Sequence, residues 1–214
     1  MTSTLILTST GLSDERVREA VRARADFSRH KKVALITTAA PEKEKSSYVQ
    51  SDYQILKDIG FSDIDFFDVE KKSSPYSNAL ENIGIRRREN NVSGLRNYGV
   101  VYVAGGNTFY LLHHLRKSGA DAVLREMLEK RAILYIGVSA GSIIMGKSIA
   151  SSADENTVGL QDLAGLGLLD AVIIPHFGDH KHAIRDRMTA QGYRVVCLKD
   201  GEALVIEHGR EIFV

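Results

Sequence analysis

Apolar runs alternate with stretches of helical periodicity along most of the chain. The apolar runs predict buried strands at residues 5–7, 32–37, 64–69, 100–103, 132–136, 169–174 and 193–198. The stretches between them predict helices at residues 14–25 with Ser13 as N-cap, 46–59 closed by Gly60, 108–117, 120–130 and 184–191. Strands that are apolar throughout and separated by helices are typical of a mainly parallel sheet with helices on both faces.

The pattern predicts an α/β protein whose residues 1–214 form a single three-layer domain. The last residues, GEALVIEHGREIFV, predict a C-terminal β-hairpin of two short strands around His208 and Gly209. The polar stretch at residues 70–96 gives no clear pattern beyond one short helix, and no repeat or linker is visible. The length of 214 residues fits one domain near the usual upper size, or two very small ones, and the absence of a linker favours one.

Composition narrows the class of protein. Hydrophobic residues make up 43% and charged residues 26%, which is typical of a globular protein with a sizeable core. The formal net charge of +1 gives no overall field that favours nucleic acid or an anionic membrane. The single cysteine, Cys197, permits no internal disulfide, and no signal peptide or membrane-spanning run is visible. We therefore expect a cytoplasmic protein without nucleic-acid or membrane partners.

The stretch YIGVSAGSI places Ser139 in the spacing G-x-S-x-G, directly after an apolar run. A serine on a tight turn from a strand into a helix is exposed as a nucleophile, and the glycines give it room. An ordinary βα turn, rich in Gly and Ser, has the same sequence pattern. A second glycine-rich turn, Gly105-Gly106-Asn107, follows another predicted strand. Both turns are expected at the carboxyl edge of the sheet, where ligands bind in such folds.

A serine nucleophile needs a base, usually histidine, and a third group that orients the base. His176 is the best candidate, because it follows the apolar run Val172-Ile173-Ile174-Pro175 and stands at the same edge. Asp154 and Glu155 lie on a polar loop, and either is able to orient an imidazole. The backbone N–H groups of Gly106 and Ala140 are candidate donors to an oxyanion.

His180 and His182 have a spacing that suits a metal, but the sequence shows no third ligand near them. We therefore predict neither a metal nor a cofactor. We expect the base to be His176 rather than His180 or His182.

Three motifs in order resemble the dipeptidase E family of serine peptidases, which includes the aspartyl dipeptidases and the cyanophycinases. They are AGGNT-F at 104–109, GVSAGS at 137–142 and IPHF at 174–177, with an acid at position 154 between the last two. The resemblance implies a class I glutamine amidotransferase-like fold, Ser139 as nucleophile, His176 as base and Asp154 as acid. It also implies an oxyanion hole formed by Gly106 and Ala140.

The resemblance also bears on the substrate. Aspartyl dipeptidases hydrolyse dipeptides with an N-terminal Asp, and they hold its carboxylate with an arginine beyond the Pro-His-Phe segment. Arg185 falls nearest to that role here, Arg187 competes with it, and Asn107 is a further substrate-binding candidate. The residues around Asp179-His180-Lys181-His182 depart from the aspartyl enzymes, which leaves the preference for N-terminal Asp open.

The leading hypothesis is a serine peptidase that acts on small peptides as a monomer or a homodimer. An esterase of the α/β-hydrolase type shares the order Ser, Asp, His, but this chain is short and has no HGGG-type motif. A non-catalytic, amidotransferase-like binding module is the other alternative, because a fold alone does not fix a function.

Overall fold

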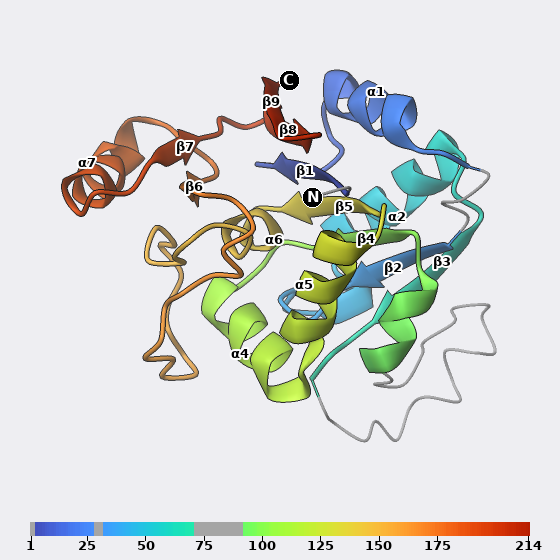
Figure 1. Ribbon diagram of the computed structural model, residues 1–214, viewed down its shortest axis with the longest axis horizontal. Coiled ribbons are helices and arrows are strands. Elements are labelled where there is room, and N and C mark those ends of the chain that lie inside the picture. Colours follow the sequence, from blue (N-terminus) through green and yellow to red (C-terminus); the bar gives the residue numbers. More distant parts are fainter. Residues whose placement is uncertain (1–2, 28–31, 71–91) are drawn as a thin grey trace.

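The computed structural model describes residues 3–27, 32–70 and 92–214. The described residues form a main sheet in the strand order β3-β2-β4-β5-β1-β8-β9 (Figure 1). The bounds are β1 Thr4–Thr8, β2 Lys32–Ile36, β3 Asp63–Phe67, β4 Val100–Val103, β5 Leu134–Val138, β8 Ala203–Glu207 and β9 Arg210–Phe213. Strands β1 to β5 are parallel, whereas β8 and β9 are antiparallel to their neighbours. The predicted mainly parallel sheet and the C-terminal hairpin are confirmed.

Helices cover both faces of this sheet (Figure 1). Their bounds are α1 Glu15–Arg24, α2 Ser47–Ile59, α4 Thr108–Ser118, α5 Ala120–Lys130, α6 Ala140–Ile143 and α7 His182–Ala190, with short 3₁₀ helices at Lys43–Lys45, Val92–Asn97 and Asp179–Lys181. Side chains alternate across each strand, so Ile6 belongs to the core under α1 and α2, while Leu5 and Leu7 belong to the core under α4 and α5. Each such fully buried aliphatic side chain contributes about 1.5–3 kcal/mol to stability.

A second, two-stranded sheet carries part of the C-terminal third. Strands β6 (Val172–Ile174) and β7 (Val195–Cys197) pair in parallel, and α7 packs beside β7 at one side of the main sheet (Figure 1). The sequence did not reveal this separation, because β6 is as apolar as the strands of the main sheet. The position beside β1 that a further parallel strand would take is filled by β8.

Most predicted helix boundaries agree with the structure within one or two residues. Helix α5 has the predicted bounds, and α2 ends at Ile59 with Gly60 as its C-cap, where a φ of 124° suits glycine. The prediction of Ser13 as the N-cap of α1 is wrong: the N-cap is Asp14, whose side chain accepts a hydrogen bond from the backbone N–H of Arg16. Most of the polar stretch at residues 70–96 lies outside the described residues.

The strand order brings the two glycine-rich turns together. Strands β4 and β5 are neighbours, so the turns that follow them, at residues 104–107 and 137–141, share one edge of the sheet. A Cβ added at Gly105 would lie 3.5 Å from Cβ of Ser139. In the described ranges, no helix is long and apolar enough to cross a membrane.

Candidate active site

Ser139 lies on a strained turn between β5 and α6. Its φ of 46° and ψ of −102° are unusual for a residue with a side chain and cost about 1–3 kcal/mol. The turn is held by hydrogen bonds from the N–H of Ser139 to the carbonyl oxygen of Thr8 and from the N–H of Ile143 to the carbonyl oxygen of Ser139. A Cβ at Gly137 would lie 2.6 Å from the carbonyl oxygen of Gly141, so the G-x-S-x-G spacing permits the close packing of this turn.

The second glycine-rich turn faces Ser139. Gly106 has a φ of 131°, and a Cβ there would lie 2.0 Å from the carbonyl oxygen of Ala39. That oxygen accepts a hydrogen bond from the N–H of Asn107, which fixes the turn against the loop after β2. The candidate oxyanion donors, the N–H groups of Gly106 and Ala140, therefore belong to two turns at the same edge of the sheet.

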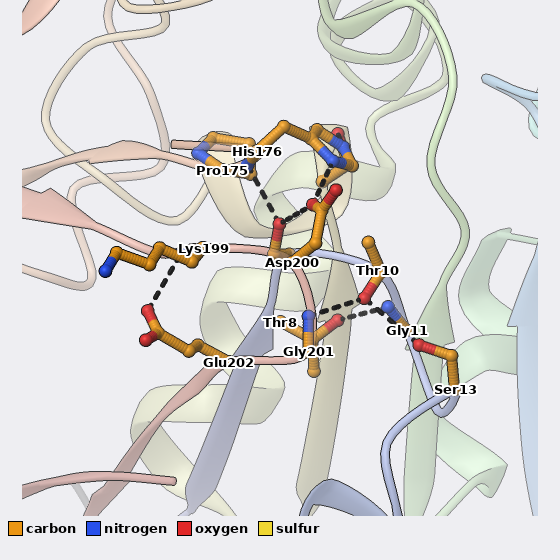
Figure 2. Close-up of polar contacts among 12 residues, drawn as sticks. Thr8, Thr10, Gly11, Ser13, Pro175, His176, Lys199, Asp200, Gly201 and Glu202 are labelled. Atoms are coloured by element: carbon orange, nitrogen blue, oxygen red, sulfur yellow. Dashed lines mark hydrogen bonds and ion pairs between the residues drawn. The ribbon is translucent and has the colours of Figure 1, made fainter. Parts of the chain in front are cut away.

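His176 stands two residues beyond the end of β6, with a φ of 53°. Its Nε2 lies 3.0 Å from Oγ of Ser139, and its Nδ1 lies 2.7 Å from Oδ1 of Asp200. The His176 and Asp200 side chains point toward one another (Figure 2). An ionised carboxylate only accepts hydrogen bonds, so Nδ1 carries the proton and Nε2 is free to accept one from the serine.

The acid beside His176 is Asp200, which sequence reasoning missed. Burial alone would raise the pKa of Asp200, but hydrogen bonds from His176 and Ser9 and the charge of Lys181 hold it below the ordinary value. The carboxylate is thus ionised at neutral pH and suited to stabilising an imidazolium.

The turn that carries Asp200 is anchored on the end of β1. Thr10 Oγ1 accepts a hydrogen bond from the N–H of Gly201 at 3.0 Å (Figure 2). Ser9 links Asp200 to His176. Its Oγ donates a hydrogen bond to Asp200 Oδ1 at 2.9 Å and accepts one from the backbone N–H of His176 at 2.8 Å. Ser9 therefore fixes both His176 and Asp200 with one hydroxyl. Ser9 stands two residues beyond the predicted strand at 5–7, and this position was the available sequence signal.

Asp154 has a different set of partners from the one predicted for it. Its Oδ2 accepts from the N–H of Thr108 at 2.8 Å, from Thr108 Oγ1 at 2.7 Å and from Ser152 Oγ at 2.8 Å. The predicted contact of Asp154 with His176 is wrong. The Asp154 carboxylate caps the start of α4, and the His176 imidazole is hydrogen-bonded to Asp200 instead. Asp154 thereby supports the turn that contains Gly106.

Asn107 and Arg185, the candidate substrate-binding residues, have partners of their own. Asn107 is the N-cap of α4, with Oδ1 accepting from the N–H of Tyr110 and Nδ2 donating to the carbonyl oxygen of Glu155. Arg185 pairs with Asp186 at 2.8 Å, and its guanidinium lies 5.9 Å from the ring centroid of Phe177. Their binding roles stay predictions.

A cavity of about 530 Å³ opens beside Ser139. Ser139, His176, Gly105 and Gly106 line one part of it, and residues of α2 line another. This size is typical of a small-molecule site. Arg185 is not among its lining residues.

The described residues contain no group of three or more His, Cys, Asp or Glu side chains placed to hold a metal ion. His182 has Asp179 at 3.9 Å as an ion-pair partner. Ser139, His176 and Asp200 lie in series at this site through the contacts of the two imidazole nitrogens.

The chain is similar to known peptidases in sequence and in fold. Residues 5–213 match the model of peptidase family S51. An uncharacterised peptidase of Listeria monocytogenes is 31% identical over 70% of this chain and 67% of its own length. Peptidase E of Escherichia coli is 31% identical over 59% of each chain. A Listeria monocytogenes protein described as peptidase E has a crystal structure that covers 100% of this chain and 98% of its own, at a TM-score of 0.74 and 26% identity.

Proposed function

Because the chain belongs to peptidase family S51 and is a serine-type peptidase, we propose that it hydrolyses small peptides through Ser139, His176 and Asp200. The observation that carries this proposal is the unbroken series of contacts from Ser139 Oγ to His176 Nε2 at 3.0 Å and from His176 Nδ1 to Asp200 at 2.7 Å. A nucleophile next to a base that is itself oriented by a third group is the arrangement that acyl transfer requires.

In the acylation step, Ser139 Oγ attacks the carbonyl carbon of the scissile peptide while His176 Nε2 takes the hydroxyl proton. Asp200 stabilises the imidazolium that forms. The N–H groups of Gly106 and Ala140 donate to the oxyanion of the tetrahedral intermediate. His176 then gives the proton to the leaving amine as the C–N bond breaks, which leaves an ester on Ser139. Water, deprotonated by His176, hydrolyses this ester and releases the acid.

The strained backbone of Ser139 and His176 supports this assignment. Both residues have side chains and yet adopt positive φ values of 46° and 53°. Such conformations persist only where surrounding contacts hold them, and they cluster at functional sites. Contacts from the end of β1 reach both residues: the carbonyl oxygen of Thr8 accepts a hydrogen bond from the N–H of Ser139, and Ser9 Oγ accepts one from the N–H of His176.

The experiment is hydrolysis of a dipeptide library by the wild-type protein and by Ser139→Ala, His176→Ala and the double variant. Each single variant should lose most of the turnover, and the double variant should lose little more, because the two residues act as a unit. His180→Ala is the matched control, since His180 is exposed. Wild-type-like hydrolysis by Ser139→Ala would refute the proposal. Turnover of esters alone would favour the esterase, and a Ser139 that resists serine-directed reagents would favour the binding module.

A further inference from the structure

If the protein has the proposed function, the position and lining of the cavity beside Ser139 indicate which substrate side chain it binds. It contacts both groups that would meet the scissile carbonyl, Ser139 and the Gly105–Gly106 turn. The side chain nearest to a carbonyl carbon is that of the residue that supplies the carbonyl. This cavity is therefore placed to receive the side chain of the acyl residue.

The walls of the cavity are largely apolar. Pro41, Ile55, Val138 and the ring of Tyr48 line it, and the polar lining groups are mostly hydroxyls, such as that of Ser51. Helix α2 supplies Tyr48, Ser51 and Ile55, which recur at spacings of three and four residues on one face of the helix. A cavity of about 530 Å³ with such walls suits a large aromatic or aliphatic side chain.

The acidic residue in the lining is Asp52, from the same helix. It is only 7% exposed, and Tyr102 Oη donates a hydrogen bond to its Oδ2. Burial raises the pKa of Asp52 to about 6 despite the hydrogen bonds from Tyr102 and Leu12, so it is mostly ionised at neutral pH. No Lys or Arg is among the described residues that line this cavity.

An acidic substrate side chain in this cavity would meet a carboxylate and lose its hydration without gaining a cation. Desolvation of an unpaired charge is costly, and a second carboxylate at short range adds repulsion. Arg185 does not compensate for this, because it pairs with Asp186 outside the cavity lining.

We propose that this cavity is the subsite for a large uncharged side chain of the acyl residue, and that Asp52 excludes acidic side chains from it. This inference rests on the proposed function for the hydrolysis of the substrate, whereas binding of the side chain in the cavity does not depend on that function. The proposal gives Ile55 the role of setting the size of the accepted side chain and Asp52 the role of setting its charge.

The first test measures kcat/KM for dipeptides X-Ala with X as Phe, Leu, Asn or Asp. Asn and Asp have nearly the same shape, so their ratio isolates the effect of charge. We expect Phe-Ala and Leu-Ala to be the best substrates and Asn-Ala to exceed Asp-Ala at least about tenfold. Asp-Ala as the best substrate, with its preference lost in Arg185→Ala, would overturn the proposal and support Arg185 instead.

Two variants in α2 test the assigned residues. Asp52→Asn should raise the ratio of Asp-Ala to Asn-Ala about tenfold, while Asp58→Asn on the exposed side of the same helix should leave this ratio unchanged. Ile55→Trp fills the cavity and should lower kcat/KM for Phe-Ala relative to Gly-Ala about tenfold or more. Unchanged ratios in both Asp52→Asn and Ile55→Trp would overturn the proposal.

A binding measurement separates this proposal from the proposed reaction. Titration calorimetry of the Ser139→Ala protein with intact Phe-Ala and Asp-Ala needs no turnover. At least tenfold tighter binding of Phe-Ala supports the subsite, even if the wild-type protein hydrolyses no dipeptide and the proposed function fails. Equal or tighter binding of Asp-Ala overturns the subsite.

Discussion

Tyr48 Oη lies 3.2 Å from the carbonyl oxygen of Gly105 and donates a hydrogen bond to it. This carbonyl belongs to the same planar peptide unit as the N–H of Gly106, the candidate oxyanion donor. Burial raises the pKa of Tyr48, so the hydroxyl keeps its proton and acts as the donor. Tyr48 therefore fixes the direction in which the Gly106 N–H points.

Tyr48→Phe should lower kcat about tenfold and leave KM for dipeptides nearly unchanged. The ring that lines the cavity is kept, and the donor N–H stays in place but is less well aligned, which costs less than the factor of 10² to 10³ for a deleted oxyanion donor. Steady-state kinetics give the split between kcat and KM. A rise in KM with an unchanged kcat would show that Tyr48 only contacts the bound substrate.

Asp200→Asn should reduce kcat by about 10³ to 10⁴, because an amide at this position does not hold the required tautomer of His176. Asp154→Asn should have a smaller effect on kcat, since Asp154 contacts Thr108 and Ser152 rather than the imidazole. Both variants are compared with Asp179→Asn, whose side chain is fully exposed. The opposite ranking of Asp154→Asn and Asp200→Asn would return the acid role to Asp154.

Gly106→Ala and Gly105→Ala should differ sharply in stability. At Gly106 the new Cβ would lie 2.0 Å from the Ala39 carbonyl oxygen, at a φ of 131°, so the backbone must shift. At Gly105 the nearest atoms would be at 3.5 Å, an ordinary contact. Urea unfolding should show a loss of several kcal/mol for Gly106→Ala and about 1 kcal/mol or less for Gly105→Ala. Equal losses in both variants would contradict the close approach of Gly106 to the carbonyl group of Ala39 in the loop after β2.

Asp52 should make the folded protein less stable as pH rises from about 4 to about 6. Its folded-state pKa of about 6 is above the ordinary value of 3.8, so the folded state holds this proton more tightly than the unfolded state. The stabilisation is complete below the unfolded pKa and is lost as pH passes the folded pKa, by about 3 kcal/mol. Urea unfolding of wild type and Asp52→Asn between pH 4 and pH 7 measures it. A difference between the two proteins that stays constant with pH would exclude this effect.

The positions of Ser139 and His176 at the ends of strands could be predicted because each follows an apolar run, although the strand before His176, β6, belongs to the smaller sheet. The position of Asp200 could not. It lies in the polar stretch Lys199-Asp200-Gly201-Glu202, which has the composition of any turn between two strands. Asp200 also stands two residues beyond a predicted strand, at 193–198, but its closeness to His176 depends on the parallel pairing of β7 with β6, and local pattern does not encode which strands pair.

Asp154 illustrates the opposite difficulty. Its place in the chain, between Ser139 and His176, agreed with the family resemblance. The order of residues along the chain does not show in which direction a side chain points. The loop that carries Asp154 turns toward the start of α4, where the N–H and the hydroxyl of Thr108 engage the carboxylate. An Asp side chain is able either to cap a helix or to orient a histidine. The sequence does not reveal which of these two roles a given Asp has.

Ser139 and His176 follow strands of different sheets, so the structure around each is able to open in a separate unfolding step. Ser139 is held by the main sheet, whereas His176 depends on the three-residue pairing of β6 with β7. Small units with few paired backbone groups open more readily than central strands, and amide hydrogen exchange reports such partial opening. Detachment of the small sheet would carry His176 away while the rest of the fold persists. Inactivation by mild denaturant is then expected to precede the loss of β-sheet signal, and to reverse on dilution.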